Sequence, residues 1–270
     1  MVREMNENKN ILETIADANR ARVAEQKDAV SPEEMKALAA SSPAVKGFPF
    51  EAALAAEGMS FICECKKASP SKGLIAPDFP FVGIAKEYEA AGATAVSVLT
   101  EPRWFMGSTE YLREIAENVS IPCLRKDFII DEYMIYEARA AGASAVLLIC
   151  ALLDDPDLVK YIEICDSLGL SALVEAHSEE EIRQAVRCGA RVIGVNNRDL
   201  KTFTVDVRNG VRLREKVPAD ILFIAESGIK TAEDIRILHE ANVNGVLIGE
   251  TLMRADDKKA MLDELKGGLR

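Results

Sequence analysis

The sequence predicts an α/β fold: a closed (β/α)8 barrel, or TIM barrel, with an N-terminal helical extension. Three observations predict it: short apolar runs that alternate with amphipathic stretches, a repeat that marks every second run, and helix-start signals between the runs. The chain has 270 residues, of which 49% are hydrophobic. That length suits one large α/β domain, so we expect residues 1–270 to form a single barrel domain.

The predicted strands are short and rich in β-branched residues. Their nearly continuous apolar character is typical of parallel strands that are covered on both faces. The eight predicted strands are Phe61–Lys66, Ala95–Leu99, Pro122–Lys126, Ala145–Cys150, Ala172–Glu175, Val192–Asn196, Ile221–Glu226 and Gly245–Ile248.

An internal repeat supports closure of the sheet. The segments AGATAVSV, AGASAVLL, CGARVIGV and ANVNGVLI begin at Ala91, Ala141, Cys188 and Ala241. Each reads as a helix end, a small turn residue and a strand. Because the repeat falls on every second strand, it favours a closed barrel over the alternative, an open doubly wound sheet.

Helix-start signals lie between the strands. Asp131 opens an acidic first turn, Ser178 and Glu181 have the spacing of a capping box, and Thr231 begins a similar segment. Residues 1–50 fall outside the eight units and have a helical period, with a second helix start at Ser31-Pro32. They predict an extension that covers either the bottom or the mouth of the barrel.

The charge balance excludes several classes of protein. Lys and Arg number 33 against 44 Asp and Glu, a net charge of -11, which disfavours sequence-independent nucleic-acid binding. The sequence has neither a polybasic segment for anionic membranes nor an apolar run of about 20 residues. Its polar N-terminus lacks the features of a signal peptide, and its six cysteines are scattered as in reduced proteins. We therefore expect a cytoplasmic protein that binds neither nucleic acid nor membranes.

The first strand carries two candidate catalytic residues. Glu64 and Lys66 are two positions apart and share one face of the strand. If that face lines the barrel, Cys63 and Cys65 point outward into the helix layer. The alternative for this Cys-x-Cys pair is a metal site, but the sequence offers no second Cys/His cluster, so we expect no metal.

Four further strands end in polar residues, and the active site of a barrel lies at these strand ends. One charged strand end is often simply solvated, whereas polar ends from five strands point to function, because gathering them costs stability. Besides Glu64 and Lys66, the catalytic candidates are Lys126, Glu175, Asn196 and Glu226, with Arg198 beside them.

Two glycine turns predict a phosphate site. Ser227-Gly228-Ile229 and Gly249-Glu250-Thr251 follow the last two strands as turns that open helices, where backbone N–H groups bind phosphate. The alternative is two ordinary tight turns. Glu250 is a complication, because its carboxylate repels phosphate unless the side chain points away.

Loop residues near the mouth supply further candidates. The segment Ser69–Gly73 reads as a flexible loop with room to close over a ligand. Phe105 and Phe128 are placed to wall an aromatic-ring pocket, with packing against a helix as the alternative for each. We assign no role to His177.

Taken with their order and spacing, these motifs resemble the indole-3-glycerol phosphate synthase family of tryptophan biosynthesis. The resemblance rests on Glu64-Cys65-Lys66, Ser69-Pro70-Ser71, SVLTEPRWFMGS, LRKDFI, LVEAHS, IGVNNRDL, AESGI and LIGETLM. The segment NILETIADANRARVAEQK is similar to the family's N-terminal extension. The resemblance implies conversion of 1-(2-carboxyphenylamino)-1-deoxyribulose 5-phosphate to indole-3-glycerol phosphate, carbon dioxide and water, with neither metal nor organic cofactor.

The resemblance also implies roles for the catalytic candidates. Lys126 becomes the general acid that protonates the ketone oxygen, and we expect neighbouring cations to lower its pKa. Lys66 holds the substrate carboxylate and Glu64 orients Lys66 by ion pairing. Glu175 becomes the general base or proton shuttle. How the proton transfers divide among Lys66, Lys126 and Glu175 is left open.

The remaining roles implied by the resemblance concern binding. Asn196 and Glu226 bind sugar hydroxyls, and Arg198 braces the carboxylates. The substrate ring lies against Pro70, Phe105 and Phe128 near Ser69, and the phosphate binds Ser227, Gly228, Gly249 and the Glu250 amide. Glu250 departs from the family, in which a small hydroxyl residue is common at this position. We expect a monofunctional enzyme that works as a monomer.

Two other classes of function remain open at this point. Another phosphate-binding barrel, either a ketose-phosphate isomerase or a Schiff-base aldolase with Lys66 or Lys126 as nucleophile, shares most of these features. The other class is a non-catalytic barrel that serves as a scaffold. The intact set of strand-end residues argues against a scaffold, although fold alone does not establish activity.

Overall fold

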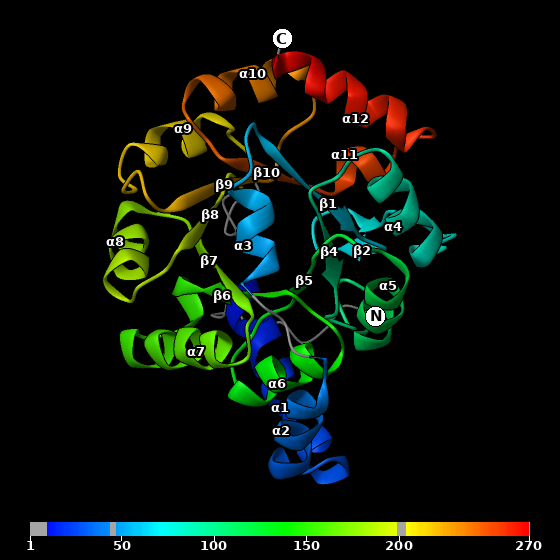
Figure 1. Cartoon of the computed structure of the whole chain (residues 1–270), viewed down its shortest axis with the longest axis vertical. Helices are drawn as coiled ribbons and strands as arrows, with labels where there is room; N and C mark the ends of the chain where they lie inside the picture. Colours follow the sequence, from blue (N-terminus) through cyan, green and yellow to red (C-terminus); the bar gives the residue numbers. More distant parts are fainter. Residues whose placement is uncertain (1–9, 44–46, 199–203, 270) are drawn as a thin grey trace.

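The computed structural model describes residues 10–43, 47–198 and 204–269. Within them, parallel strands form a closed barrel in the order β1-β10-β9-β8-β7-β6-β5-β4 (Figure 1). The strands are β1 (Ser60–Cys65), β4 (Ala95–Leu99), β5 (Cys123–Lys126), β6 (Ala145–Ile149), β7 (Ser171–Ala176), β8 (Val192–Asn196), β9 (Leu222–Glu226) and β10 (Gly245–Ile248). Because β1 pairs with both β4 and β10, the barrel prediction is confirmed and the open sheet is excluded.

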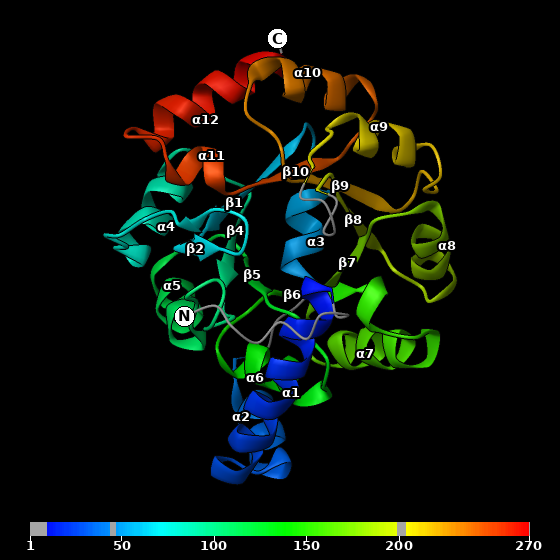
Figure 2. The same ribbon diagram turned by 180° about the vertical axis from the view of Figure 1, so that it is seen from behind.

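Helices surround the barrel on its outside (Figures 1 and 2). One helix follows each barrel strand, and a short additional helix, α11, precedes the last. These helices are α4 (Phe81–Ala90), α5 (Thr109–Asn118), α6 (Glu132–Ala140), α7 (Asp155–Ser167), α8 (Glu179–Arg187), α9 (Arg208–Arg214), α10 (Ala232–Glu240), α11 (Glu250–Met253) and α12 (Lys258–Lys266). Two 3-10 turns, Cys150–Leu152 and Gly267–Leu269, follow β6 and α12.

The repeat in the sequence is explained by one type of turn. Gly92, Gly142, Gly189 and Asn242 follow the ends of α4, α6, α8 and α10 with positive φ angles of 78°, 86°, 86° and 58°. Glycine and asparagine adopt this left-handed conformation most readily, and it ends a helix and turns the chain back toward the sheet. Each copy of the repeat therefore encodes the return from a helix to a strand.

The predicted helix starts are confirmed, with one correction to a cap. Asp131, Ser178 and Thr231 are the N-caps of α6, α8 and α10. Ser178 accepts the Glu181 N–H at 3.2 Å, as in a capping box. The Glu181 carboxylate, however, accepts the backbone N–H of His177 at 2.7 Å, so the reciprocal half of the predicted box is wrong.

The alternation of side chains along each strand builds the site. Inside the barrel, Ile62, Leu124, Leu173 and Ile224 belong to one buried apolar cluster. Two residues further along these strands, the same face presents Glu64, Lys126, Glu175 and Glu226. Cys63 and Cys65 are buried between strands and helices, as expected.

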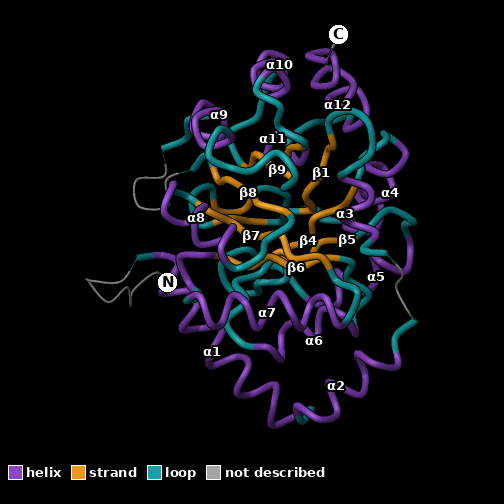
Figure 3. Tube along the Cα trace, turned by 60° about the vertical axis from the view of Figure 1, so that its left-hand side comes forward, coloured by secondary structure: helices purple, strands orange, loops and turns teal. Residues whose placement is uncertain are grey.

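The N-terminal helices cover both ends of the barrel. The sequence had not decided between the mouth and the bottom. Helix α1 (Ile11–Ala29) lies at the mouth, while α2 (Pro32–Ser41) packs against α6 (Figure 3). Helix α3 (Pro49–Leu54) closes the opposite end with Phe50 and Leu54, which are buried in the interior cluster.

One carboxylate attaches α1 to the strand end that carries Lys126. Asp127 accepts hydrogen bonds from Asn19 at 2.9 Å, from Arg22 at 2.8 Å and from Thr100 at 2.7 Å. Asn19 also donates to the carbonyl oxygen of Phe128 at 2.9 Å. The extension thus holds in place the two residues that follow Lys126.

The described ranges contain no helix that is both long enough and apolar enough to cross a membrane. The six cysteines are all buried as free thiols.

Candidate active site at the barrel mouth

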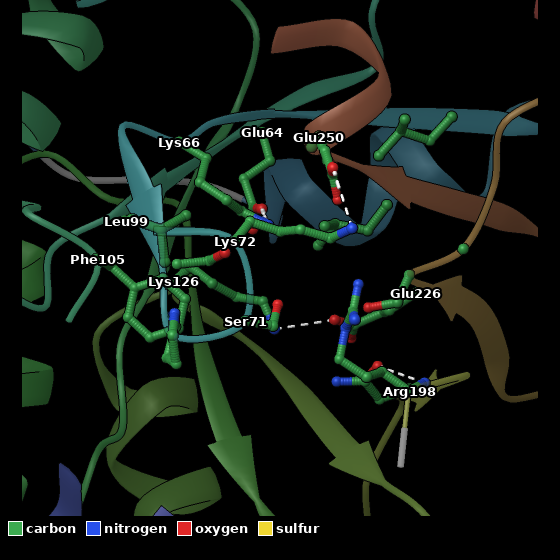
Figure 4. Close-up of a pocket in the computed structure, with 18 of the residues that line it drawn as sticks. Glu64, Lys66, Ser71, Lys72, Leu99, Phe105, Lys126, Arg198, Glu226 and Glu250 are labelled. Carbon is green, nitrogen blue, oxygen red and sulfur yellow. Dashed lines mark hydrogen bonds and ion pairs between the residues drawn. The ribbon is translucent and has the colours of Figure 1, made fainter. Parts of the chain in front are cut away.

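A cavity of about 630 Å³ lies at the carboxyl ends of the barrel strands (Figure 4). Every site residue predicted from the sequence lines it, so the polar strand ends and the apolar rings border the same space. These residues are Glu64, Lys66, Ser69, Pro70, Phe105, Lys126, Phe128, Glu175, Asn196, Arg198, Glu226, Ser227, Gly228, Gly249 and Glu250. Their convergence is observed, whereas their chemical roles remain predictions. The last two residues of the IGVNNRDL motif, 199 and 200, lie outside the described residues.

Lys126 is the centre of the polar cluster. Its ammonium lies 2.8 Å from Glu175 Oε2 and 2.9 Å from Glu226 Oε2. Burial by itself lowers the pKa of Lys126, but the negative charges of Glu175 and Glu226 outweigh burial and raise it. The expectation that neighbouring cations lower this pKa is therefore wrong, because its nearest charged partners are carboxylates.

The two carboxylates beside Lys126 differ in their pKa values. Burial tends to raise both. For Glu175, contacts with Lys126 and His177 outweigh burial and hold its pKa well below the usual range. For Glu226, burial and the charge of Glu175 prevail over Lys126 and raise its pKa to about 7. One carboxylate is therefore ionised at neutral pH while the other is close to its titration point, an arrangement that separates acid and base roles.

This difference predicts a pH-dependent stability. The pKa of Glu226 is raised from its ordinary value of 4.5 to about 7 in the folded protein. The stabilisation that Glu226 contributes to the folded state is therefore fully present below pH 4.5 and is lost as the pH rises through 7. Glu226→Gln lacks this titration. We expect the unfolding free energy of the wild type minus that of the variant to fall by roughly 3 kcal/mol across this interval. Urea unfolding at a series of pH values measures it, and a constant difference contradicts the prediction.

Glu64 and Lys66 form a second ion pair in the cavity, at the end of β1. Glu64 Oε1 lies 2.5 Å from Lys66 Nζ, and the Ser97 hydroxyl donates to Glu64 Oε2 at 3.4 Å. Gly249 borders this pair so closely that a Cβ there would lie 2.4 Å from Glu64 Oε1 and 3.0 Å from Lys66 Nζ. Gly249 is thus needed for space beside the ion pair.

Gly249→Ala is expected to displace the Glu64–Lys66 pair and to lower kcat/KM by roughly 10²-fold, the cost of a misplacement of about 1 Å. Steady-state kinetics measures this, and Gly267→Ala is the matched control. Gly267 has a φ of -56° and open space around its Cβ position. Equal activity of the two variants would show that the Glu64–Lys66 ion pair accommodates the added methyl group without loss of activity.

The aromatic wall depends on a residue that sequence reasoning missed. Phe105 and Phe128 face one another with ring centroids 6.0 Å apart. The buried Glu101 carboxylate accepts backbone N–H groups of Arg103, Trp104 and Phe105 at 2.8, 2.7 and 3.0 Å. It therefore fixes the loop that carries Phe105. In the sequence, the available signal for this role was the position of an acidic residue two places after the end of an apolar strand.

The loop after β1 is more regular than the sequence predicted. Ala68–Ser69 (β2) and Gly73–Leu74 (β3) pair as an antiparallel hairpin. From this hairpin Lys72 reaches Glu250, with 3.6 Å between Nζ and Oε1 (Figure 4). Lys72 lines the cavity and was not among the predicted site residues.

Glu250 does not point away from the cavity but is neutralised there. Besides Lys72, it accepts a hydrogen bond from Arg254 at 3.1 Å. Burial tends to raise its pKa, but Arg254, Lys72 and Arg198 lower it below the usual value. The repulsion expected from this carboxylate is therefore offset by cations that line the same cavity.

One of the two predicted phosphate turns needs correction. Gly249 is the N-cap of α11, as expected. Ser227 and Gly228, in contrast, form a left-handed turn with φ of 66° and 83° and do not open a helix. Helix α10 begins only at Ala232, and the side chain of its N-cap, Thr231, accepts the Asp234 N–H. This turn therefore presents backbone groups without a helix behind them.

Comparison with known proteins gives a consistent result. The model of the indole-3-glycerol phosphate synthase family matches residues 12–265. Proteins named indole-3-glycerol phosphate synthase are similar to this chain: that of Ruminiclostridium cellulolyticum is 55% identical, covering 95% of this chain and 99% of the relative, and that of Lachnoclostridium phytofermentans is 51% identical, covering 95% and 98%.

Solved structures of lower identity share the fold. A 3-hexulose-6-phosphate synthase aligns with a TM-score of 0.64 at 14% identity, covering 78% of this chain and 99% of that one. A thiamine phosphate pyrophosphorylase from Pyrococcus furiosus aligns with a TM-score of 0.58 at 18% identity, covering 77% and 93%.

Proposed function

We propose a division of roles at the barrel mouth from one premise: this chain belongs to the indole-3-glycerol phosphate synthase family. Its reaction converts 1-(2-carboxyphenylamino)-1-deoxyribulose 5-phosphate to indole-3-glycerol phosphate with release of carbon dioxide and water, which makes it a carboxy-lyase of tryptophan biosynthesis. The roles of individual residues are our proposal. The observation that carries it is the contact of one lysine, Lys126, with two buried carboxylates of different pKa.

Lys126 is the general acid for ring closure. The aryl carbon that bears the carboxylate attacks the ketone carbon, and the ketone oxygen takes a proton as negative charge develops on it. Because Glu175 and Glu226 raise the pKa of Lys126, the ammonium is fully protonated before substrate binds. In the transition state this ammonium stabilises the developing oxyanion, which accepts a proton from it as the basicity of the oxygen grows.

Glu175 is the general base that accepts the ring proton, while Lys66 delivers the proton with which the hydroxyl leaves as water. The low pKa of Glu175 keeps it ionised at neutral pH, and its contact with Lys126 gives a direct route for returning the proton to the lysine. Lys66, held by Glu64, binds the substrate carboxylate until it leaves as carbon dioxide and the aromatic ring is restored. These steps use only groups that line the cavity.

The remaining residues bind and orient the substrate. Asn196 and Glu226 contact sugar hydroxyls, and Arg198 balances the carboxylates. The substrate ring lies against Pro70, Phe105 and Phe128 near Ser69. The phosphate binds the turns formed by Ser227, Gly228, Gly249 and the Glu250 amide, where Lys72 supplies a nearby positive charge.

The test is turnover by purified, EDTA-treated protein, followed by indole fluorescence after addition of the carboxyphenylamino-deoxyribulose phosphate. We expect turnover that is insensitive to EDTA. Absence of turnover by folded protein would refute the assignment. A covalent adduct trapped by borohydride would instead indicate Schiff-base chemistry at Lys66 or Lys126.

We further propose that residues 1–270 form one domain that acts as a monomer in the cytoplasm, where its six buried cysteines remain reduced. Light scattering at assay concentration measures the mass, and a dimer would contradict the monomer.

A further inference from the structure

His177 lies between two carboxylates just beyond the end of β7. Its Nε2 lies 3.3 Å from Glu175 Oε1, and its Nδ1 lies 3.2 Å from Glu181 Oε2. The side chain is only 18% exposed. The Glu181 carboxylate also accepts the His177 backbone N–H at 2.7 Å, so backbone and ring are held by the same group.

This geometry selects one protonation state of the ring. A neutral imidazole donates from one nitrogen and presents a lone pair on the other, which a facing carboxylate oxygen repels. With a carboxylate at each nitrogen, only the imidazolium makes two favourable contacts. Burial lowers the pKa of His177, but Glu175 and Glu181 outweigh burial and raise it to about 10. The ring thus adds a positive charge beside the active site.

We propose that His177 is a positioning residue for the reaction: as an imidazolium anchored by Glu181, it holds Glu175 Oε1 so that Oε2 stays on Lys126, and it keeps that carboxylate ionised. The inference rests on the proposed role of Glu175 as the base. His177 does not line the cavity and therefore acts through Glu175 and not on the substrate.

The groups around this pair are consistent with that role. Glu175 faces Lys126 of β5, the Asn196 amide of β8 at 3.4 Å, and Glu226 of β9, whose partial ionisation competes for Lys126. Around Glu181, the Cys150 thiol lies 3.5 Å from the backbone carbonyl and is neutral, because burial raises its pKa to about 12. Of the groups named here, Lys126 is the positive charge at Oε2 of Glu175, and the His177 imidazolium is the positive charge at Oε1.

The first test observes the ring directly and needs no activity. The chain has two histidines, so His239→Gln leaves His177 as the single imidazole. His239 is exposed on the last turn of α10. We expect the ring resonances of His177 to keep imidazolium shifts between about pH 6 and pH 8, where an unperturbed histidine titrates. Titration of His177 near its ordinary pKa would overturn the inference.

The second test separates a positioning role from a merely structural one. His177→Gln keeps a hydrogen-bond donor but removes the charge, whereas His177→Arg keeps the charge. We expect His177→Gln to move the acid limb of the kcat/KM profile upward by about 1 pH unit or more, as loss of an opposite charge raises a carboxylate pKa. His177→Arg should restore the limb in part, and His239→Gln should leave it unchanged.

The outcomes distinguish this inference from the proposed function. An unchanged acid limb in folded His177→Gln, or a uniform loss of rate at every pH, would overturn the inference while leaving the synthase intact. Lack of wild-type turnover would overturn the proposed function, and the ring titration would still report the state of His177.

Discussion

Lys126→Met is expected to lower kcat by about 10²- to 10⁴-fold, the usual contribution of a general acid. Methionine retains much of the volume of lysine but supplies neither a proton nor a charge. It also leaves Glu175 and Glu226 facing one another without the ammonium that lies 2.8 and 2.9 Å from them. Without the ammonium the pKa values of both carboxylates rise, and Glu226, whose pKa is already about 7, takes up a proton first.

The measurement is single-turnover and steady-state kinetics by indole fluorescence, with KM determined separately. Lys259→Met is the matched control, because Lys259 is 64% exposed and forms a surface ion pair with Asp263 at 2.5 Å. A Lys126→Met variant that retains nearly full kcat would transfer the acid role to Lys66. A folding check by circular dichroism excludes collapse as the cause of a loss.

Glu175→Gln is the second variant with a large expected effect. The amide preserves the shape of the side chain but accepts no proton at neutral pH, so we expect kcat to fall by about 10²- to 10⁴-fold. The pKa of Glu226 should fall at the same time, because the charge of Glu175 is one of the causes that raise it.

Glu180→Gln is the control for this substitution. Glu180 lies in the first turn of α8 and is 77% exposed, so the same chemical change there should leave kcat within experimental error. If Glu175→Gln retained its rate but showed a raised KM, Glu175 would be a binding residue and the base would lie elsewhere. Such a result would leave Glu226 as the nearest titratable group to Lys126.

Local properties of this protein follow from its sequence. Apolar runs with β-branched residues predicted the barrel strands to within one residue at each end, because strand formation and burial on both faces depend on nearby side chains. The spacing of Glu64 and Lys66 predicted that they share a face of the first strand, and the two side chains form an ion pair. The turn residues Gly92 and Asn242 marked the helix ends, because the left-handed backbone conformation that ends a helix depends on the residue at that position.

Relations between distant residues were decided only by the tertiary structure. Lys126 lies 49 positions from Glu175 and 100 from Glu226, and closure of the barrel brings carboxylates and not cations to its ammonium. The contact of His177 with Glu175 depends on how Glu181 turns at the start of α8, which a capping pattern did not reveal. The sequence determined which groups stand at the strand ends, but their pKa values depend on burial and on charges a few ångströms away, and only the folded barrel sets those distances.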